Sequence, residues 1–127
     1  MSNLLPSDGQ YTGIYTTSVG TTFVEVTSAD FADVASNVQG TMLPDDLVFT
    51  SLTIEDTHGT QTVLVGYGPA GDRDDTTNML RVRPLTTASW SVRGQLVDGG
   101  PVTTLTLGGS GAGTTLLVTA TFTRSAI

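Results

Sequence analysis

The run Thr-Thr-Leu-Leu-Val-Thr-Ala-Thr-Phe-Thr-Arg at residues 114–124 decides the fold class. Apolar side chains occupy its even positions, Leu116, Val118, Ala120 and Phe122, and Thr occupies the odd positions 119, 121 and 123. Successive side chains of an extended chain point to opposite faces, so this two-residue period predicts a half-buried β-strand.

Two more strand-like runs precede this one, at residues 89–97 and 102–107. Asp-Gly-Gly-Pro at 98–101 and Gly-Gly-Ser-Gly-Ala-Gly at 108–113 connect the three runs. Glycine-rich connections between short alternating runs are typical of tight turns, so we expect an antiparallel meander.

The first half of the chain predicts two further strand pairs. Residues 12–17 and 21–27 suggest a hairpin with Ile14 and either Val24 or Val26 facing inward, and residues 47–54 and 61–67 suggest a second pair. Thr27 to Ala35 has the only helical character, one or two turns at most, with Thr27 or Ser28 as the candidate N-cap. An irregular loop explains that segment equally well.

A short strand at residues 79–83 brings the count to seven or eight strands, and a βαβ crossover has no helix to use. We therefore expect an all-β protein: a single-domain antiparallel β-sandwich or jelly-roll-like barrel at residues 11–127. Residues 1–10 have little periodicity and read as an irregular N-terminal arm that could embrace a neighbouring subunit.

Charge and cysteine content limit the classes of function. The formal net charge is -7 and the isoelectric point is near 4.1, which disfavours nucleic acid and anionic membrane as partners. The absence of cysteine excludes disulfides and thiolate metal sites. The first ten residues lack the basic and apolar regions of a signal peptide, so we expect synthesis in the cytoplasm.

Threonine dominates the polar residues of this chain. About one residue in five is Thr, and only 13% are charged, against a usual share of about 25%. Threonine is β-branched and polar, which suits the outward face of a sheet. A hydroxyl-covered surface with few charges is easily covered by another protein; the alternative is a plain β domain whose outward positions happen to be Thr.

The longest break, residues 66–78, contains Gly-Tyr-Gly-Pro-Ala-Gly, a literal G-x-G-x-x-G at 66–71. The dinucleotide fingerprint needs a following helix and an acidic residue about 20 positions on. Here Pro69 interrupts the loop and Asp72-Arg73-Asp74-Asp75 follows, so we expect a surface loop and no bound cofactor.

Asp72, Asp74, Asp75 and Asn78 supply enough oxygen atoms for a calcium ion, although their spacing is not that of an EF-hand. The alternative, which we prefer, is a solvated acidic loop partly neutralised by Arg73. We therefore predict no metal site.

Other potentially reactive residues lack the partners that catalysis needs, so we expect no catalytic residues. His58 is the only histidine and lies in a polar turn. Asp45 and Asp46 are adjacent and would point to opposite faces of a strand. Trp90, the only tryptophan, shares its strand face with Val92 and Leu96, which favours a core position over a sugar-stacking platform.

Residues 11–68 resemble small β proteins of tailed-phage and gene-transfer-agent heads. The resemblance rests on an aromatic-ended strand at Ile14-Tyr15, a Thr/Val-rich strand at 21–27, a Gly-Thr-Met-Leu-Pro turn at 40–44, and paired strands at 47–49 and 61–67. Proteins of this kind decorate the capsid as cement proteins or form the bases of head spikes. The resemblance implies no catalytic residues.

Together these features predict a virion structural protein: a capsid decoration protein that binds the outside of the head and stabilises the shell. We expect the major capsid protein as its partner, a homo-oligomer with a trimer favoured, and a location on the capsid exterior. The candidate partner-binding residues lie in the arm and in the long loop: Leu4, Leu5, Pro6, Tyr67, Pro69, Asp72 and Arg73.

The alternative is a glycan-binding or host-recognition module of a phage fibre, spike or tail appendage. That function requires Trp90 or Tyr67 to be exposed to solvent.

Overall fold

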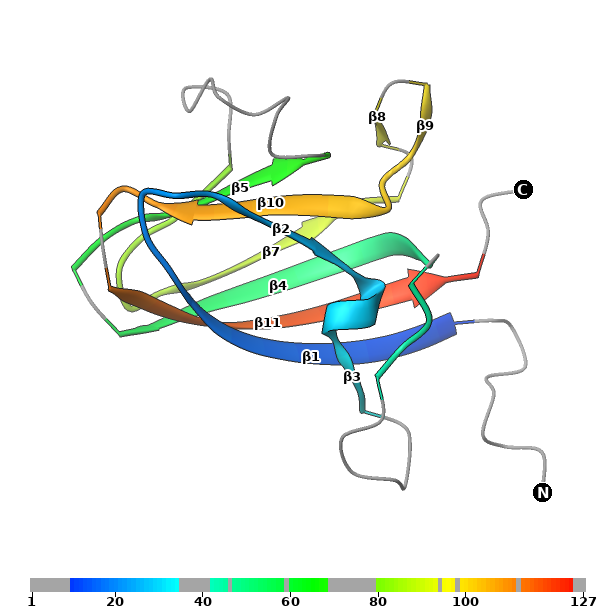
Figure 1. The fold of residues 1–127 in the computed structure, drawn as a ribbon, viewed down its shortest axis with the longest axis horizontal. Helices are drawn as coiled ribbons and strands as arrows, with labels where there is room; N and C mark the ends of the chain where they lie inside the picture. Colours follow the sequence, from blue (N-terminus) through cyan, green and yellow to red (C-terminus); the bar gives the residue numbers. More distant parts are fainter. Residues whose placement is uncertain are drawn as a thin grey trace.

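The computed structural model describes residues 10–34, 42–45, 47–58, 60–68, 80–93, 95–97, 99–111 and 113–124. Strands dominate these residues (Figure 1). In chain order the elements are β1 (Gln10–Val19), β2 (Val24–Thr27), the 3-10 helix η1 (Ser28–Asp30), β3 (Ala32–Asp33), β4 (Val48–His58), β5 (Val63–Tyr67), β6 (Leu80–Val82), β7 (Thr87–Ser91), β8 (Leu96–Val97), β9 (Gly100–Pro101), β10 (Thr104–Gly109) and β11 (Thr114–Thr123).

The strands form two facing sheets in jelly-roll order. Sheet A has the order β3-β1-β11-β4-β7, and sheet B has the order β2-β10-β5-β6. All pairings are antiparallel, and Figure 1 shows the two sheets as separate layers. Without the two-residue strands β3, β8 and β9, eight strands remain, four in each sheet, as in a double-sheet jelly roll. The predicted all-β sandwich is confirmed.

Strand β11 lies in the middle of sheet A and follows the predicted alternation along its whole length. Leu116, Val118, Ala120 and Phe122 are buried, and the residues between them are half-buried on the outer side. β11 pairs with β1 from Gln10↔Thr123 to Val19↔Thr114, and with β4 on its other edge. The last described strand therefore holds the first strand in place.

An aromatic cluster fills the core between the sheets. The rings of Phe31, Phe49 and Phe122 contact one another with centroid distances between 4.6 and 5.8 Å, and Tyr15 lies 5.5 Å from Phe31. Gly13 allows this approach, because a Cβ there would lie 2.7 Å from the Cβ of Phe31. These tilted and edge-to-face arrangements are the favourable geometries for aromatic pairs.

Several predicted strand partners are wrong, and the predicted run at residues 89–97 is not one strand, because β7 ends at Ser91 and β8 begins at Leu96 in another sheet. β1 and β2 do not form a hairpin, because β1 pairs with β11 in sheet A and β2 pairs with β10 in sheet B. The predicted pair β4 and β5 is likewise divided between the sheets. The C-terminal meander is absent for the same reason, since β10 and β11 belong to different sheets.

The inward face of β1 also differs from the prediction. Tyr11 and Gly13 are buried, whereas Ile14 points outward and is 39% exposed; of the two alternatives in β2, Val26 is buried and Val24 is exposed. The core face of β1 carries two tyrosines and a glycine, so apolarity alone indicated the wrong face.

The predicted helical segment is a single 3-10 turn at η1. The backbone N–H of Thr27 donates to Oδ2 of Asp30 at 2.9 Å, as in a capping box. The buried Oγ of Ser28 donates to the carbonyl oxygen of Pro44 and accepts the backbone N–H of Leu47 at 3.3 Å. Ser28 thereby fastens the chain that leads into β4.

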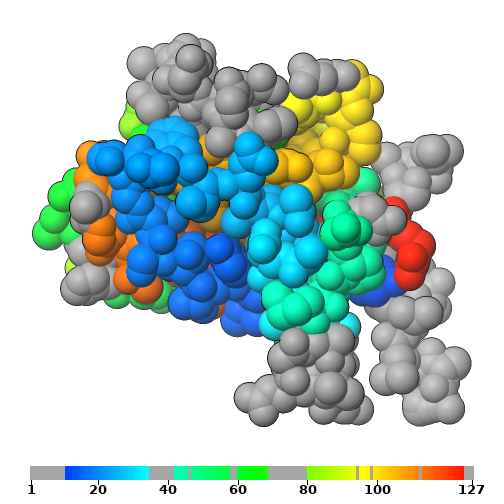
Figure 2. Space-filling view, viewed as in Figure 1, coloured from blue at the N-terminus to red at the C-terminus, as the bar shows by residue number. Residues whose placement is uncertain are grey.

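One end of the sandwich gathers the beginning of β1, the end of β11, the beginning of β4 and the β8–β9 hairpin (Figures 1 and 2). Gln10 pairs with Thr123 there. The guanidinium of Arg124 donates to the hydroxyl of Tyr11 at 2.6 Å and lies 5.7 Å from its ring centroid, within cation–π range. This contact clasps the first strand to the last.

Phe122→Ala should lower the free energy of unfolding by about 3–5 kcal/mol, because it removes a fully buried ring from the aromatic cluster and leaves a cavity. Thr119→Ala, on the outer face of the same strand, should change it by less than about 1 kcal/mol. Urea titrations of both variants measure the difference. Equal losses would mean that the cluster does not determine stability.

Candidate protein interface

Sheet A presents an outer face, whereas the two central strands of sheet B are covered on both sides. Residues of β11 alternate between buried and half-buried, but all residues of β5 except Tyr67 and all of β10 except Thr104 are buried. On β10, the ring of Phe23 fills the space where a Cβ on Gly108 would lie. The outer face of sheet A is therefore the accessible sheet surface among the described strands.

Hydroxyl side chains form rows across this surface. The residues facing outward lie opposite one another in register on β1, β11, β4 and β7. The rows are Thr12, Thr121, Ser51 and Ser91; Ile14, Thr119, Thr53 and Ser89; and Thr16, Leu117, Glu55 and Thr87. We call these residues the hydroxyl face; Ile14, Leu117 and Glu55 are its members without a hydroxyl.

Hydrogen bonds between neighbouring strands hold several of these hydroxyls in place. The Oγ of Ser51 lies 2.6 Å from the Oγ1 of Thr121, and the Oγ1 of Thr53 lies 2.9 Å from the Oγ of Ser89. A β-bulge in β4 adds Thr50, whose Oγ1 is 2.7 Å from that of Thr121. A surface with fixed side chains loses little conformational entropy when a partner covers it.

The charge of the hydroxyl face is low. Glu55 is its only ionisable residue, although the whole chain has a net charge of -7. Burying a charge without a partner is costly, whereas a hydroxyl can both donate and accept hydrogen bonds. A protein surface can therefore cover this face at a small desolvation cost.

An apolar margin adjoins the hydroxyl face at the β3 edge of sheet A. Ala32 pairs with Ile14 on one side and with Met42 on the other. Met42 and Val34 are about half exposed. Hydroxyls beside exposed apolar groups give this surface the mixed polarity of a typical protein–protein interface.

Tyr67 is the one predicted contact residue within the described part of the chain. It lies at the end of β5 opposite Leu105, is partly buried and packs against the core. Just beyond it, the carbonyl oxygen of Gly68 accepts a hydrogen bond from the Oγ1 of Thr106 at 2.6 Å. The other predicted contact residues, Leu4, Leu5, Pro6, Pro69, Asp72 and Arg73, lie outside the described residues.

The remaining sequence candidates fall into three groups. Trp90 lies opposite Leu52 and packs against the core as predicted, and His58 ends β4 rather than lying in a turn. Asp45 is exposed. The calcium candidates Asp72, Asp74, Asp75 and Asn78, and also Asp46, lie outside the described residues.

The described residues contain no group of three His, Cys, Asp or Glu residues that could hold a metal ion. Within the same described residues, no helix is long and apolar enough to span a membrane.

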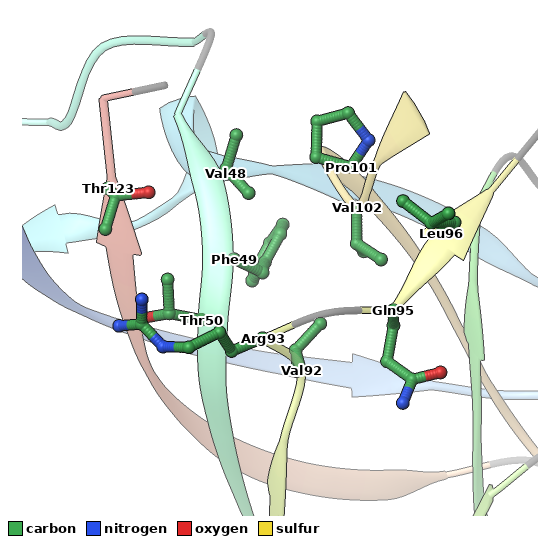
Figure 3. Close-up of a pocket in the computed structure, with 10 residues that line it drawn as sticks. All are labelled: Val48, Phe49, Thr50, Val92, Arg93, Gln95, Leu96, Pro101, Val102 and Thr123. Atoms are coloured by element: carbon green, nitrogen blue, oxygen red, sulfur yellow. The ribbon is translucent and has the colours of Figure 1, made fainter. Parts of the chain in front are cut away.

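A groove of about 310 Å³ opens at the end of the sandwich that carries the beginning of β1 (Figure 3). Its lining is mainly apolar, with one positive charge, at Arg93. The lining residues are Val48, Phe49, Thr50, Val92, Arg93, Gln95, Leu96, Pro101, Val102 and Thr123. No local sequence pattern predicts this groove, because its walls come from three separate stretches of the chain.

No protein-family model matches this sequence, and no curated protein matches it. Solved structures do match. A chain from Bacillus endospore appendages, which form a family of disulfide-linked pili, is similar at a TM-score of 0.54 and 19% identity, over 91% of this chain and 88% of that one. At this identity the likeness shows a shared fold alone.

The coat protein of Tobacco streak virus is similar at a TM-score of 0.46 and 12% identity, over 99% of this chain and 93% of that one. That score is too low to support a further conclusion.

Tyr67 should make stability depend on alkaline pH. Burial raises its pKa above the ordinary value of 10.0, so the folded state keeps a proton that the unfolded state releases near pH 10. Stability should therefore fall as pH rises past about 10. Tyr67→Phe should show a smaller fall between about pH 9 and pH 11 in urea titrations, and Thr119→Ala should behave as wild type. Identical slopes in all three proteins would contradict the assignment.

Proposed function

We propose that this chain is a non-catalytic structural subunit, a capsid decoration protein that adds to the outside of a tailed-phage head. The hydroxyl face of sheet A is the observation that carries the proposal. It is an ordered, nearly uncharged sheet surface with apolar groups at its edge, which suits contact with another protein. The pattern at residues 11–68, which resembles head proteins of tailed phages, supports the same role.

Many copies of the interface on one shell would together supply the affinity that a single small interface lacks. A face of four strands and three rows measures roughly 19 Å by 20 Å, from the usual strand spacing and rise. That area is smaller than the roughly 800 Å² per partner of a standard interface. Copies linked to one another on a symmetric lattice bind together, so weak contacts add up to stable attachment.

The shared fold with a chain of pilus-forming appendages is compatible with a structural role. Those pili are disulfide-linked, whereas this chain has no cysteine. Contacts between copies of this chain therefore cannot use disulfide bonds.

The competing proposal, a glycan-binding module, receives less support from the aromatic residues. It requires an exposed ring at Trp90 or Tyr67, and both side chains are partly buried against the core. The hydroxyl face itself contains no aromatic side chain on which a sugar could stack.

Co-sedimentation with empty tailed-phage heads tests the decoration role. The wild-type chain should pellet with the heads and saturate at a fixed number of copies per head. Thr119→Arg, which places a charge in the middle of the hydroxyl face, should weaken binding at least tenfold, because the charge would be buried without a partner.

Leu85→Arg is the matched control, since Leu85 lies in the turn before β7 and is 68% exposed. It should bind as wild type, and thermal melts should show that both variants fold. Failure of the wild type to pellet, or equal binding by Thr119→Arg, would contradict the proposal.

A further inference from the structure

We infer that the end groove binds residues 4–6, Leu-Leu-Pro, of a second copy of this chain, so that neighbouring subunits exchange their N-terminal arms. This inference rests on the proposed function. Exchange of arms would provide the contact between copies that attachment to a lattice requires. The hydroxyl face would then contact the shell, and the groove would join the subunits.

The chemistry of the groove matches that of the arm. Val48, Val92, Leu96, Pro101 and Val102 make its walls apolar, and Figure 3 shows these side chains around a common space. The arm offers two leucines and a proline in succession. Peptides commonly bind through a few apolar anchors of this kind, each seated in a pocket.

Charges at the two surfaces are complementary. Arg93 is the only charged residue among those that line the groove, and it is exposed. Asp8 is the only charged side chain in residues 1–9. Opposite charges favour correct encounter and orientation, and this pair acts between molecules that otherwise repel each other through a net charge of -7.

The groove and the origin of the arm lie at the same end of the molecule. Gln10 pairs with Thr123, and Thr123 itself lines the groove. Nine residues can span about 30 Å when extended, and the five from Gln10 to Leu5 about 17 Å. When the ends of two copies meet, each arm can therefore reach the groove of the other.

The requirement for contacts between subunits favours this exchange over binding of the arm in its own groove. β1 begins at the groove end, where Gln10 pairs with Thr123 and Arg124 contacts Tyr11. An arm bound in a neighbouring groove joins two copies, whereas an arm bound in its own groove joins none.

Disulfide trapping tests the inference, because the chain has no cysteine of its own. The isotopically labelled variant Leu5→Cys is mixed with the unlabelled variant Leu96→Cys, and the mixture is mildly oxidised. Intact mass spectrometry then identifies the disulfide-linked pairs. Leu85→Cys replaces Leu96→Cys in the control, since the two leucines are 68% and 69% exposed. Arm exchange should give the labelled–unlabelled pair in at least tenfold excess over the control, and equal yields would overturn the inference.

The double variant Leu5→Cys/Leu96→Cys separates the two possible sources of the arm. Exchange between copies should give covalently linked oligomers, whereas an arm in its own groove would give an internally closed monomer and overturn the inference. In light scattering, Leu96→Asp should reduce the mass of the wild-type oligomer to the monomer value of 13.2 kDa, and Leu85→Asp should not.

These measurements use the purified chain without phage heads, so the two proposals fail separately. Absence of arm exchange with normal head binding would refute only the inference about the groove. Arm exchange without head binding would refute only the decoration role.

Discussion

The pairing of β11 along both of its edges is the constraint on which the structure depends. β11 joins β1 to β4 across the middle of sheet A, and its alternation of apolar and hydroxyl residues gives that sheet an inner and an outer face. A shift of one residue would carry Phe122 to solvent and Thr121 into the core, so the register is strongly specified. The core and the hydroxyl face are thus two consequences of one strand.

The inner face is completed by residues from distant parts of the chain. Phe31 follows η1 and reaches the rings of Phe49 and Phe122 through the space that Gly13 leaves open. Ser28 bonds to Pro44 and Leu47 and so fixes the chain that enters β4. Because the chain has no disulfide, packing and strand pairing provide the stability of the fold.

The two surfaces proposed as contact sites differ in chemistry, and each suits a different task. The hydroxyl face is broad, ordered and nearly uncharged, which fits repeated contact with a shell. The end groove is small and apolar, with one guanidinium, which fits a short peptide segment. Once copies lie side by side on a lattice, or once the first of two exchanged arms has bound, the next arm would meet its groove at high effective concentration, so a modest intrinsic affinity would be sufficient.

The sequence by itself determined that the chain is all-β, which face of β11 is buried, and that Thr would cover outward positions, because these features follow from a two-residue period. Only the tertiary structure decided that β1 and β2, and likewise β4 and β5, belong to opposite sheets. It also decided that Ile14 faces outward, and that Leu96, Pro101 and Thr123 surround one groove. The physical reason is that the two-residue period shows which side chains of a strand share a face, but does not show which strands lie beside it. Pairing between distant strands depends on how the whole set of apolar faces can be buried together.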